Sequence, residues 1–222
     1  MLSCKKIYKS YNNTNPNLNI VIDNVDLTIQ QGELIALRGP SGSGKTTLLN
    51  AISGLDRVTS GDIIFENNNL TTMSNDELSS FRSKNIGIIF QFFNLLNDLT
   101  VMENISMPLL LRGIDKKVIH HKALKLVKEL GLEERINYKT NILSGGESQK
   151  VAIARSLIAQ PKIILADEPT GNLDTENTEK IIELLINSCK ESNSSLLIVS
   201  HDENIIKHFD IVYELNSGKL SN

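Results

Sequence analysis

Residues 39–46 read Gly39-Pro40-Ser41-Gly42-Ser43-Gly44-Lys45-Thr46, and this stretch decides the fold that we predict. It fits the pattern G-x-x-x-x-G-K-[ST], in which glycines let the backbone curl so that successive N–H groups point at an anion. The apolar run 34–37 predicts a strand before the loop, and residues 46–52 predict a helix after it. Strand, glycine loop and helix in this order predict a cradle for the phosphates of a nucleotide.

The side chains of the loop predict how the phosphates are held. Lys45 would reach the β- and γ-phosphates, and the Thr46 hydroxyl would offer a hard oxygen ligand to Mg²⁺. The backbone amides of residues 42–47, Thr47 included, and the positive end of the following helix would neutralise further negative charge. We therefore expect a nucleotide bound together with Mg²⁺.

Length and composition are those of an ordinary globular protein. The chain has 222 residues, of which 40% are hydrophobic and 22% charged, enough for one large domain or two small ones. The net charge of −3 argues against nucleic acid as a partner, because binding to its phosphates usually requires a basic surplus. Cys4 and Cys189 form no metal-binding spacing, and we expect both to be free thiols of an intracellular protein.

The chain contains no stretch typical of a membrane span or of an export signal. No run approaches 18 consecutive apolar residues. The charges near the N-terminus are not followed by the apolar segment of a signal peptide. We expect a soluble protein, so any work at a membrane would require a second chain that supplies the spans.

Hydrophobic patterning predicts an α/β fold. The first 30 or so residues alternate polar and apolar side chains, which predicts antiparallel strands with one solvated face. Short apolar runs predict a parallel sheet buried on both faces, with strands at 34–37, 86–90, 163–166 and 196–199. Helical spacing over 115–132 interrupts this order and predicts a helical subdomain inserted into the core. The expected apolar face of that helix is Val118, Ala123, Leu124, Val127 and Leu130, with Gly131 as the stop.

The strand at 163–166 ends in two adjacent carboxylates, Asp167 and Glu168. Asp167 would hold Mg²⁺ directly or through water, whereas Glu168 would orient and deprotonate an attacking water. The alternative is an ordinary strand end with two solvent-exposed acids, which would have the same residue pattern. The phosphate-binding loop upstream favours the catalytic interpretation.

A third motif, Leu143-Ser144-Gly145-Gly146-Glu147, precedes another predicted helix. Ser144 and Glu147 have the spacing of a capping box, which does not require the two glycines between them. Two glycines at a helix N-terminus expose bare N–H groups and so offer a second anion site. Because this second site would lie on the inserted subdomain, we predict two chains arranged head to tail. Each chain would lend its Ser-Gly-Gly segment to the nucleotide of the other.

In this order and spacing, the motifs resemble those of the ATP-binding subunits of ABC transporters over almost the whole chain. The resemblance implies ATP and Mg²⁺ as ligands and residues 143–147 as the family's signature motif. Gln91 matches the glutamine that senses Mg²⁺ and the attacking water, and His201 matches the histidine that contacts the γ-phosphate. Asp174 matches a loop that crosses the dimer interface, and Tyr11 takes the place of the aromatic residue that stacks on adenine.

The resemblance also implies the complete site and the domain organisation. The expected catalytic residues are Lys45, Gln91, Glu168 and His201, and the expected metal ligands are Thr46, Gln91 and Asp167. Residues 1–222 would form one ATP-binding domain with a P-loop NTPase core, an N-terminal antiparallel β subdomain and a helical subdomain at approximately 92–160. Two positions depart from the family pattern: Glu147 stands where glutamine is common, and Lys150 where arginine is common. Glutamate serves a capping box equally well, and Lys150 keeps the positive charge.

A finer resemblance, carried by residues 54–61, 91–96 and 100–105, is to subunits that serve MacB-like, lipoprotein-releasing and antimicrobial-peptide permeases. It implies an ATP-hydrolysing motor that works as a homodimer on the cytoplasmic face of the cell membrane. Its partner would be a separate membrane permease, bound near residues 91–105, that exports peptides, lipoproteins or amphipathic drugs.

A non-transport ABC ATPase is the alternative. DNA-repair members insert coiled coils or zinc modules between the two main motifs, and here about a hundred residues separate them without heptads or cysteine clusters. Translation factors carry two cassettes in one chain, and this chain has one. A cell-division regulator of the same size stays open. A plain P-loop kinase or GTPase would leave residues 143–147 unexplained.

Overall fold

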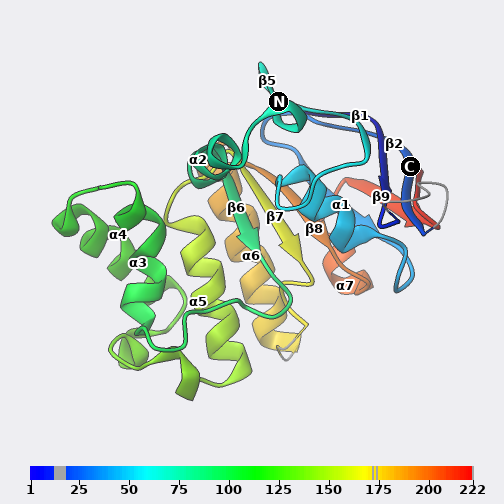
Figure 1. Ribbon diagram of the computed structural model, residues 1–222. Coiled ribbons are helices and arrows are strands. Elements are labelled where there is room, and N and C mark those ends of the chain that lie inside the picture. Colours follow the sequence, from blue (N-terminus) through cyan, green and yellow to red (C-terminus); the bar gives the residue numbers. More distant parts are fainter. Residues whose placement is uncertain (13–18, 172, 174, 222) are drawn as a thin grey trace.

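The computed structural model of the protein describes residues 1–12, 19–171, 173 and 175–221. An antiparallel sheet lies beside a larger, mostly parallel sheet, and α3 (Val101–Leu111) and α4 (Lys116–Glu129) form the end of the molecule opposite to β1 and β2 (Figure 1). This arrangement places a helical end and a sheet end on either side of the central strands.

The antiparallel sheet has the strand order β2-β1-β4-β5. Its strands are β1 (Leu2–Ser10), β2 (Ile20–Ile29), β4 (Ser60–Phe65) and β5 (Asn68–Asn69). Alternate residues of β2 are buried, as Val25, Leu27 and Ile29 show. The predicted antiparallel strands with one solvated face are therefore confirmed.

The larger sheet has the strand order β10-β9-β3-β8-β7-β6, parallel from β9 to β6 and antiparallel at β10. Its strands are β3 (Leu34–Arg38), β6 (Ile86–Ile89), β7 (Ile163–Asp167), β8 (Ser195–Val199), β9 (Ile211–Asn216) and β10 (Lys219–Ser221). Every residue of β7 and β8 is buried, as expected for central strands that are covered on both faces. The four strands predicted from apolar runs are confirmed, and β9 and β10 extend the sheet beyond them.

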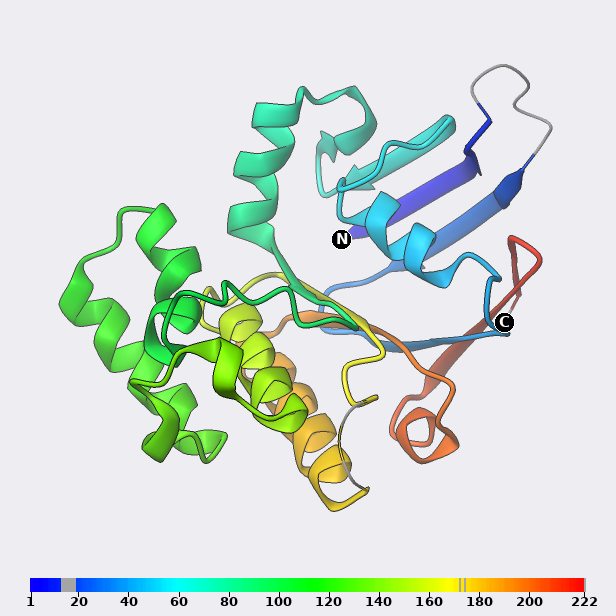
Figure 2. The same ribbon diagram turned by 60° about the horizontal axis from the view of Figure 1, so that its bottom comes forward.

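Alternate residues of the central strands feed two separate hydrophobic cores, because successive side chains of a strand point to opposite faces. Ile164 and Ile198 belong to the core that contains residues of α5 (Gly145–Leu157) and α6 (Thr175–Ser192). Leu165 and Val199 belong to the core shared with the antiparallel sheet and with α1 (Lys45–Ile52). Figure 2 shows α5 and α6 side by side on their face of the sheet.

Helices α3, α4 and α5 lie in the stretch between β6 and β7. Three short 3₁₀ helices, η1 (Leu70–Thr72), η2 (Glu133–Arg135) and η3 (Thr140–Ile142), and two further α-helices, α2 (Asn75–Asn85) and α7 (Glu203–Ile206), complete the described elements. The predicted helix at 115–132 is thus observed as α4.

The predicted apolar face of α4 was partly wrong. Ala123, Val127 and the following Leu130 are buried, but Val118 and Leu124 are 47% and 41% exposed. Ile119 takes the core position instead, because residues 119, 123 and 127 follow the four-residue spacing of one helix face. Gly131 has φ +64° just beyond the helix, a conformation that glycine adopts without strain, so the predicted stop is confirmed.

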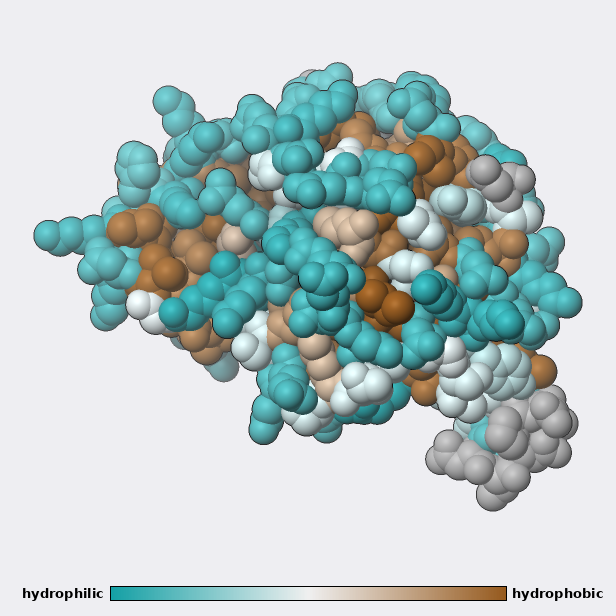
Figure 3. Space-filling view, turned by 90° about the horizontal axis from the view of Figure 1, so that it is seen from above, coloured by the Kyte–Doolittle hydropathy of each residue, from teal (hydrophilic) through white to brown (hydrophobic). Residues whose placement is uncertain are grey.

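The surface seen from above is mostly hydrophilic, with hydrophobic patches at the helical end of the molecule and also over the rest of this face (Figure 3). Among the described residues, no helix combines the length and apolar character needed to cross a bilayer. Cys4 and Cys189 are buried free thiols, as predicted, and burial is the main cause that raises the pKa of each to about 12.

Candidate functional site

A cavity of about 690 Å³ opens at the carboxyl ends of β3, β7 and β8, where parallel sheets usually bind ligands. It brings together residues from segments far apart in the sequence. Its lining contains Gly39, Pro40, Ser41, Gly42, Gly44, Lys45, Thr46, Thr47, Gln91, Asp167, Glu168 and His201, together with Val21, Gly171 and Val199. The four expected catalytic residues and the three expected metal ligands therefore share one cavity.

Two glycines of the loop leave no room for a side chain. Gly44 has φ +104°, and a Cβ atom there would lie 2.6 Å from the carbonyl oxygen of Val21. A Cβ atom at Gly39 would lie 2.1 Å from the carbonyl oxygen of Leu215. The loop is thus pressed against β2 and β9. Within the described part of the chain, no side chain caps the start of α1, so its first N–H groups remain for an anion.

The loop lysine is held in place by the loop itself. Lys45 Nζ donates hydrogen bonds of 2.8 Å to the carbonyl oxygens of Gly39 and Pro40. Ser43, the one loop residue that is absent from the cavity lining, is buried, and its hydroxyl has no hydrogen-bond partner among the described residues. A triphosphate entering the loop would give the Lys45 ammonium a stronger, charged acceptor.

Thr46 and Asp167 form a pair of oxygen ligands suited to Mg²⁺. Thr46 Oγ1 donates a 2.7 Å hydrogen bond to Asp167 Oδ2, and Gln91 lines the same cavity. The described residues include no cluster of three or more His, Cys, Asp or Glu suited to a metal. Mg²⁺ bound through a nucleotide needs only one or two protein ligands, because phosphates and water supply the rest. The residues present therefore fit this ion.

Glu168 and His201 are already in contact. Glu168 Oε1 lies 2.8 Å from His201 Nδ1, and this hydrogen bond, together with the carboxylate charge, raises the pKa of His201. Glu168 has φ +47°, a left-handed conformation that costs a non-glycine residue about 1–3 kcal/mol and is concentrated at functional sites. The strained backbone and the histidine together aim the carboxylate into the cavity.

The Ser144 motif forms a self-contained helix start. Ser144 Oγ accepts a hydrogen bond of 3.3 Å from the Glu147 N–H, and Glu147 Oε2 accepts one of 2.9 Å from the Ser144 N–H. Arg135 Nε donates to Glu147 Oε1 at 2.7 Å, and the hydrogen bonds from Ser144 are the main cause that lowers the pKa of Glu147. Ser144, Gly145, Gly146 and Glu147 are absent from the lining of the 690 Å³ cavity.

Of the other predicted residues, Tyr11 is absent from the cavity lining. Tyr11 is 54% exposed, and its hydroxyl donates a 2.7 Å hydrogen bond to Asp56 Oδ2. Asp174 lies outside the residues that the structure describes.

Sequence reasoning missed one residue that supports the site. Arg155 on α5 donates hydrogen bonds to the carbonyl oxygens of Phe93 at 2.7 Å and Asn94 at 2.6 Å. Phe93 and Asn94 lie two and three residues after Gln91. Both have left-handed backbones, with φ of +52° and +49°. The only sequence signal was the place of Arg155 on the helix that starts at the Ser144 motif.

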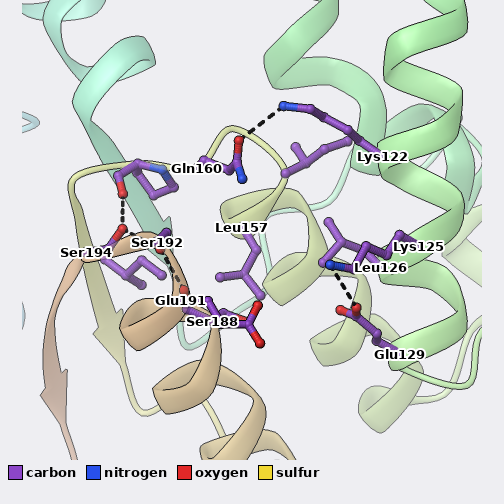
Figure 4. A pocket seen from close by; sticks show the side chains of 13 residues that line it. Lys122, Lys125, Leu126, Glu129, Leu157, Gln160, Ser188, Glu191, Ser192 and Ser194 are labelled. Carbon is purple, nitrogen blue, oxygen red and sulfur yellow. Dashed lines mark hydrogen bonds and ion pairs between the residues drawn. The ribbon is translucent and has the colours of Figure 1, made fainter.

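A second cavity, of about 230 Å³, lies between α4 and the C-terminal ends of α5 and α6 (Figure 4). Lys122 Nζ donates to Gln160 Oε1 at 3.2 Å, and Lys125 pairs with Glu129 at 3.7 Å. Its lining contains two lysines and two glutamates, Glu129 and Glu191, and none of the predicted site residues. The balanced charges do not favour an anion, so the catalytic chemistry belongs to the larger cavity.

The strand–loop–helix cradle, the Thr46–Asp167 pair and the carboxylate of Glu168 define a P-loop nucleoside triphosphatase. The model of the ABC transporter family matches residues 22–171. The chain therefore belongs to the ABC transporter family, in which it is an ATP-binding subunit that hydrolyses ATP.

Individual relatives agree with this assignment. The chain is 44% identical over 220 residues to the lipoprotein-releasing system ATP-binding protein LolD of Wigglesworthia glossinidia brevipalpis, an alignment that covers 99% of this chain and 96% of that protein. It is 42% identical over 221 residues to LolD of Pseudoalteromonas translucida (strain TAC 125), and this alignment covers 100% of this chain and 95% of that protein. The fold is similar to a dimeric, post-hydrolysis structure of the ATP-binding cassette MJ0796 bound to ADP and Pi. The TM-score is 0.94 with 37% identity, covering 100% of this chain and 97% of that one. The predicted α/β fold with its antiparallel β subdomain is confirmed.

Proposed function

We propose that this chain is the motor subunit of a lipoprotein-releasing type of ABC transporter and works with a separate membrane permease. The observation that carries the proposal is the near full-length similarity to lipoprotein-releasing ATP-binding proteins, at 44% identity for the relative from Wigglesworthia. The permease would be a separate chain, and none of the described helices combines the length and apolar character needed to cross a bilayer. The motor would then sit on the cytoplasmic face of the membrane, and nucleic acid has no part in its action.

The hydrolytic site would be completed by a second copy of the chain. The large cavity supplies the phosphate loop and Glu168, whereas the Ser144 motif lies outside its lining, where Gly145 and Gly146 offer bare N–H groups. A head-to-tail homodimer would close each cavity with the Ser144 motif of the partner. The dimeric form of the similar cassette MJ0796 supports this arrangement.

Within the closed site, the chain's own residues would bind and orient ATP. Lys45 would exchange the carbonyl oxygens of Gly39 and Pro40 for the β- and γ-phosphates, and the free N–H groups of α1 would hold the remaining charge. Thr46, Asp167 and Gln91 would hold Mg²⁺, which neutralises charge on the phosphates.

Glu168 would accept the proton of the water that attacks the γ-phosphate. Its Oε1 lies 2.8 Å from His201 Nδ1, and the second carboxylate oxygen can accept the proton while this contact persists. His201 would contact the γ-phosphate, as expected for the residue that matches the family's histidine.

We further propose that residues 92–160 form a helical subdomain of a single domain, and that the permease docks at its junction with the core. Phe92 is 80% exposed directly after Gln91, and Leu96 is 49% exposed. Apolar side chains beside a residue of the nucleotide site are well placed to pass its closure to a partner. Leu95, by contrast, packs against the hydrophobic core.

The test is co-purification and reconstitution with the membrane protein encoded beside this chain. A stable complex whose ATPase rate rises when a lipoprotein substrate is added would support the proposal. Phe92→Asp should erase that stimulation and leave the basal rate of the isolated chain unchanged. Glu133→Gln, on the exposed η2 turn, is the control that should preserve both rates. A stable complex with a permease for small nutrients would contradict the cargo class, and failure of any membrane protein to co-purify would favour a non-transport role such as cell-division regulation.

A further inference from the structure

Lys9, Tyr11 and Asp56 form a cluster of side chains whose first and last members have no role in the chemistry above. Asp56 Oδ1 lies 2.6 Å from Lys9 Nζ, and Asp56 Oδ2 accepts a 2.7 Å hydrogen bond from the Tyr11 hydroxyl. Lys9 Nζ also donates to the carbonyl oxygen of Arg57 at 2.7 Å. The Asp56 carboxylate therefore connects Lys9 on strand β1 with Tyr11, the first residue after that strand.

Lys9 is placed beneath the aromatic ring. Its Nζ lies 4.6 Å from the centroid of the Tyr11 ring, within the range of a cation–π contact. Lys9 is only 8% exposed, and a charge buried to this degree is costly unless it is paired. The cluster pairs it with Asp56, so the buried lysine is a built feature of the fold.

Tyr11 remains accessible although Lys9 lies against its ring. Lys9 covers one face of the ring, but the residue as a whole remains 54% exposed. The hydrogen bond to Asp56 restricts the ring, so less rotational freedom is lost when a ligand stacks on it. The Lys9 cation attracts the negative charge of the ring face that it covers. The ring should then repel a second π system on its opposite face less strongly.

Asp56 stays charged and can serve both partners. Burial acts to raise its pKa, but the hydrogen bonds from Lys9 and Tyr11 outweigh burial and hold the pKa of Asp56 below its usual value. An ionised carboxylate accepts from both neighbours at once. The ring position is thus set by charged contacts and does not depend on a ligand.

We propose that Lys9 and Asp56 are positioning residues that hold Tyr11 ready for the nucleotide base, Asp56 by anchoring the hydroxyl and Lys9 by occupying the ring face opposite to the base. The proposal rests on the expected stacking of Tyr11 on adenine. Stacking on an aromatic face accepts any base, so the cluster would strengthen binding of the base without selecting among bases.

The experiment compares two probes, one with and one without the adenosine group. The binding of Mg·ATP and of Mg·tripolyphosphate, which has no base, is measured by calorimetry on the full chain carrying Glu168→Gln to prevent hydrolysis. Lys9→Met keeps the length of the side chain and removes the cation, and Tyr11→Phe keeps the ring and removes its anchor. Each should weaken ATP binding about threefold to tenfold, the scale of one cation–π contact or one hydrogen bond, and should leave tripolyphosphate binding within about twofold.

The controls separate this proposal from the stacking role itself. Lys5→Met, an exposed lysine on the same strand, should change neither affinity. If Tyr11→Ala removes the advantage of ATP over tripolyphosphate but Lys9→Met and Tyr11→Phe do not, the stacking role stands and the positioning role is wrong. If Tyr11→Ala leaves that advantage intact, the base binds elsewhere and both roles are wrong. If Lys9→Met weakens the binding of both probes equally, it acts through the fold or through the electrostatic potential at the phosphate site. That result would also overturn the proposal.

Discussion

Helix α1 begins directly after a glycine and α5 begins with two glycines, yet the two helix starts present different sites. The start of α1 lacks a side-chain cap among the described residues, and it opens into a cavity that also contains Asp167 and Glu168. The start of α5 is closed by the Ser144–Glu147 capping box and is absent from the lining of that cavity. One helix start thus belongs to a nearly complete catalytic site, and the other offers N–H groups without catalytic neighbours. The difference explains why a single copy of this chain would bind ATP but would need a second copy to hydrolyse it.

The largest effect is expected at the complete site. Glu168→Gln should lower the ATPase rate by at least about a hundredfold, the scale of general-base catalysis, because the amide cannot accept a proton. ATP binding should persist, and an ATP-bound dimer should accumulate on size-exclusion chromatography. Full turnover in this variant would remove Glu168 from its role.

The second expected effect separates the two helix starts. Ser144→Ala should abolish hydrolysis in the homodimer, leave the ATP affinity of the isolated chain unchanged, and cost about 1 kcal/mol of stability through the lost cap. Ser74→Ala is the matched control, because Ser74 and Glu77 form the same capping box at the start of α2. It should lower stability to a similar degree and preserve hydrolysis.

A mixture tests whether the site is shared between chains. A Lys45→Ala chain mixed with a Ser144→Ala chain should regain one competent site per heterodimer. Activity could also fail to return because hydrolysis needs two intact sites, and this must be excluded separately. If it is excluded and no mixing ratio restores activity, both motifs serve the same chain and the proposed difference between the two helix starts is wrong.

A smaller effect is expected where the two regions meet. Arg155 binds the carbonyl oxygens of Phe93 and Asn94, so α5 is tied directly to the segment that follows Gln91. Arg155→Lys cannot hold both carbonyls with a planar fork, and the ATPase rate should fall about tenfold with little change in ATP affinity. Arg82→Lys loses a similar contact to Gly54 far from this segment and should keep the full rate. Equal losses in both variants would point to general destabilisation.

The smallest effect concerns protonation. Glu168 raises the pKa of His201, and Glu168→Gln should return it toward the ordinary histidine value in an NMR titration without nucleotide. Because the folded-state pKa is raised, the pair stabilises the fold below the ordinary value, and this contribution disappears as the pH rises through the raised one. The His201 side chain is 80% exposed, so solvent keeps the contribution small. An unchanged pKa in the variant would show that the pair is absent in solution.

Local patterns predicted the loop, the central strands and the capping box, because each depends on residues close together in the sequence. Sequence order also led to Glu168 and His201, which lie at or just beyond the carboxyl ends of neighbouring buried strands. The apolar face of α4 could not be predicted fully, because Val118 and Ile119 are equally apolar and only packing against α3 and α5 decides between them. The contact of Lys9 with Asp56 and that of Arg155 with Phe93 join residues 47 and 62 positions apart. No local rule anticipates such pairs.

The two buried thiols have a practical consequence for following the motor through its cycle. Maleimide dyes and thiol-specific spin labels react with the nucleophilic thiolate, and a pKa of about 12 leaves Cys4 and Cys189 almost entirely protonated near neutral pH. A cysteine introduced at an exposed position, such as Leu111 on the helical end, would therefore be labelled selectively in the otherwise natural chain. Distances between such labels in two copies could then report each opening and closing without the removal of any native cysteine.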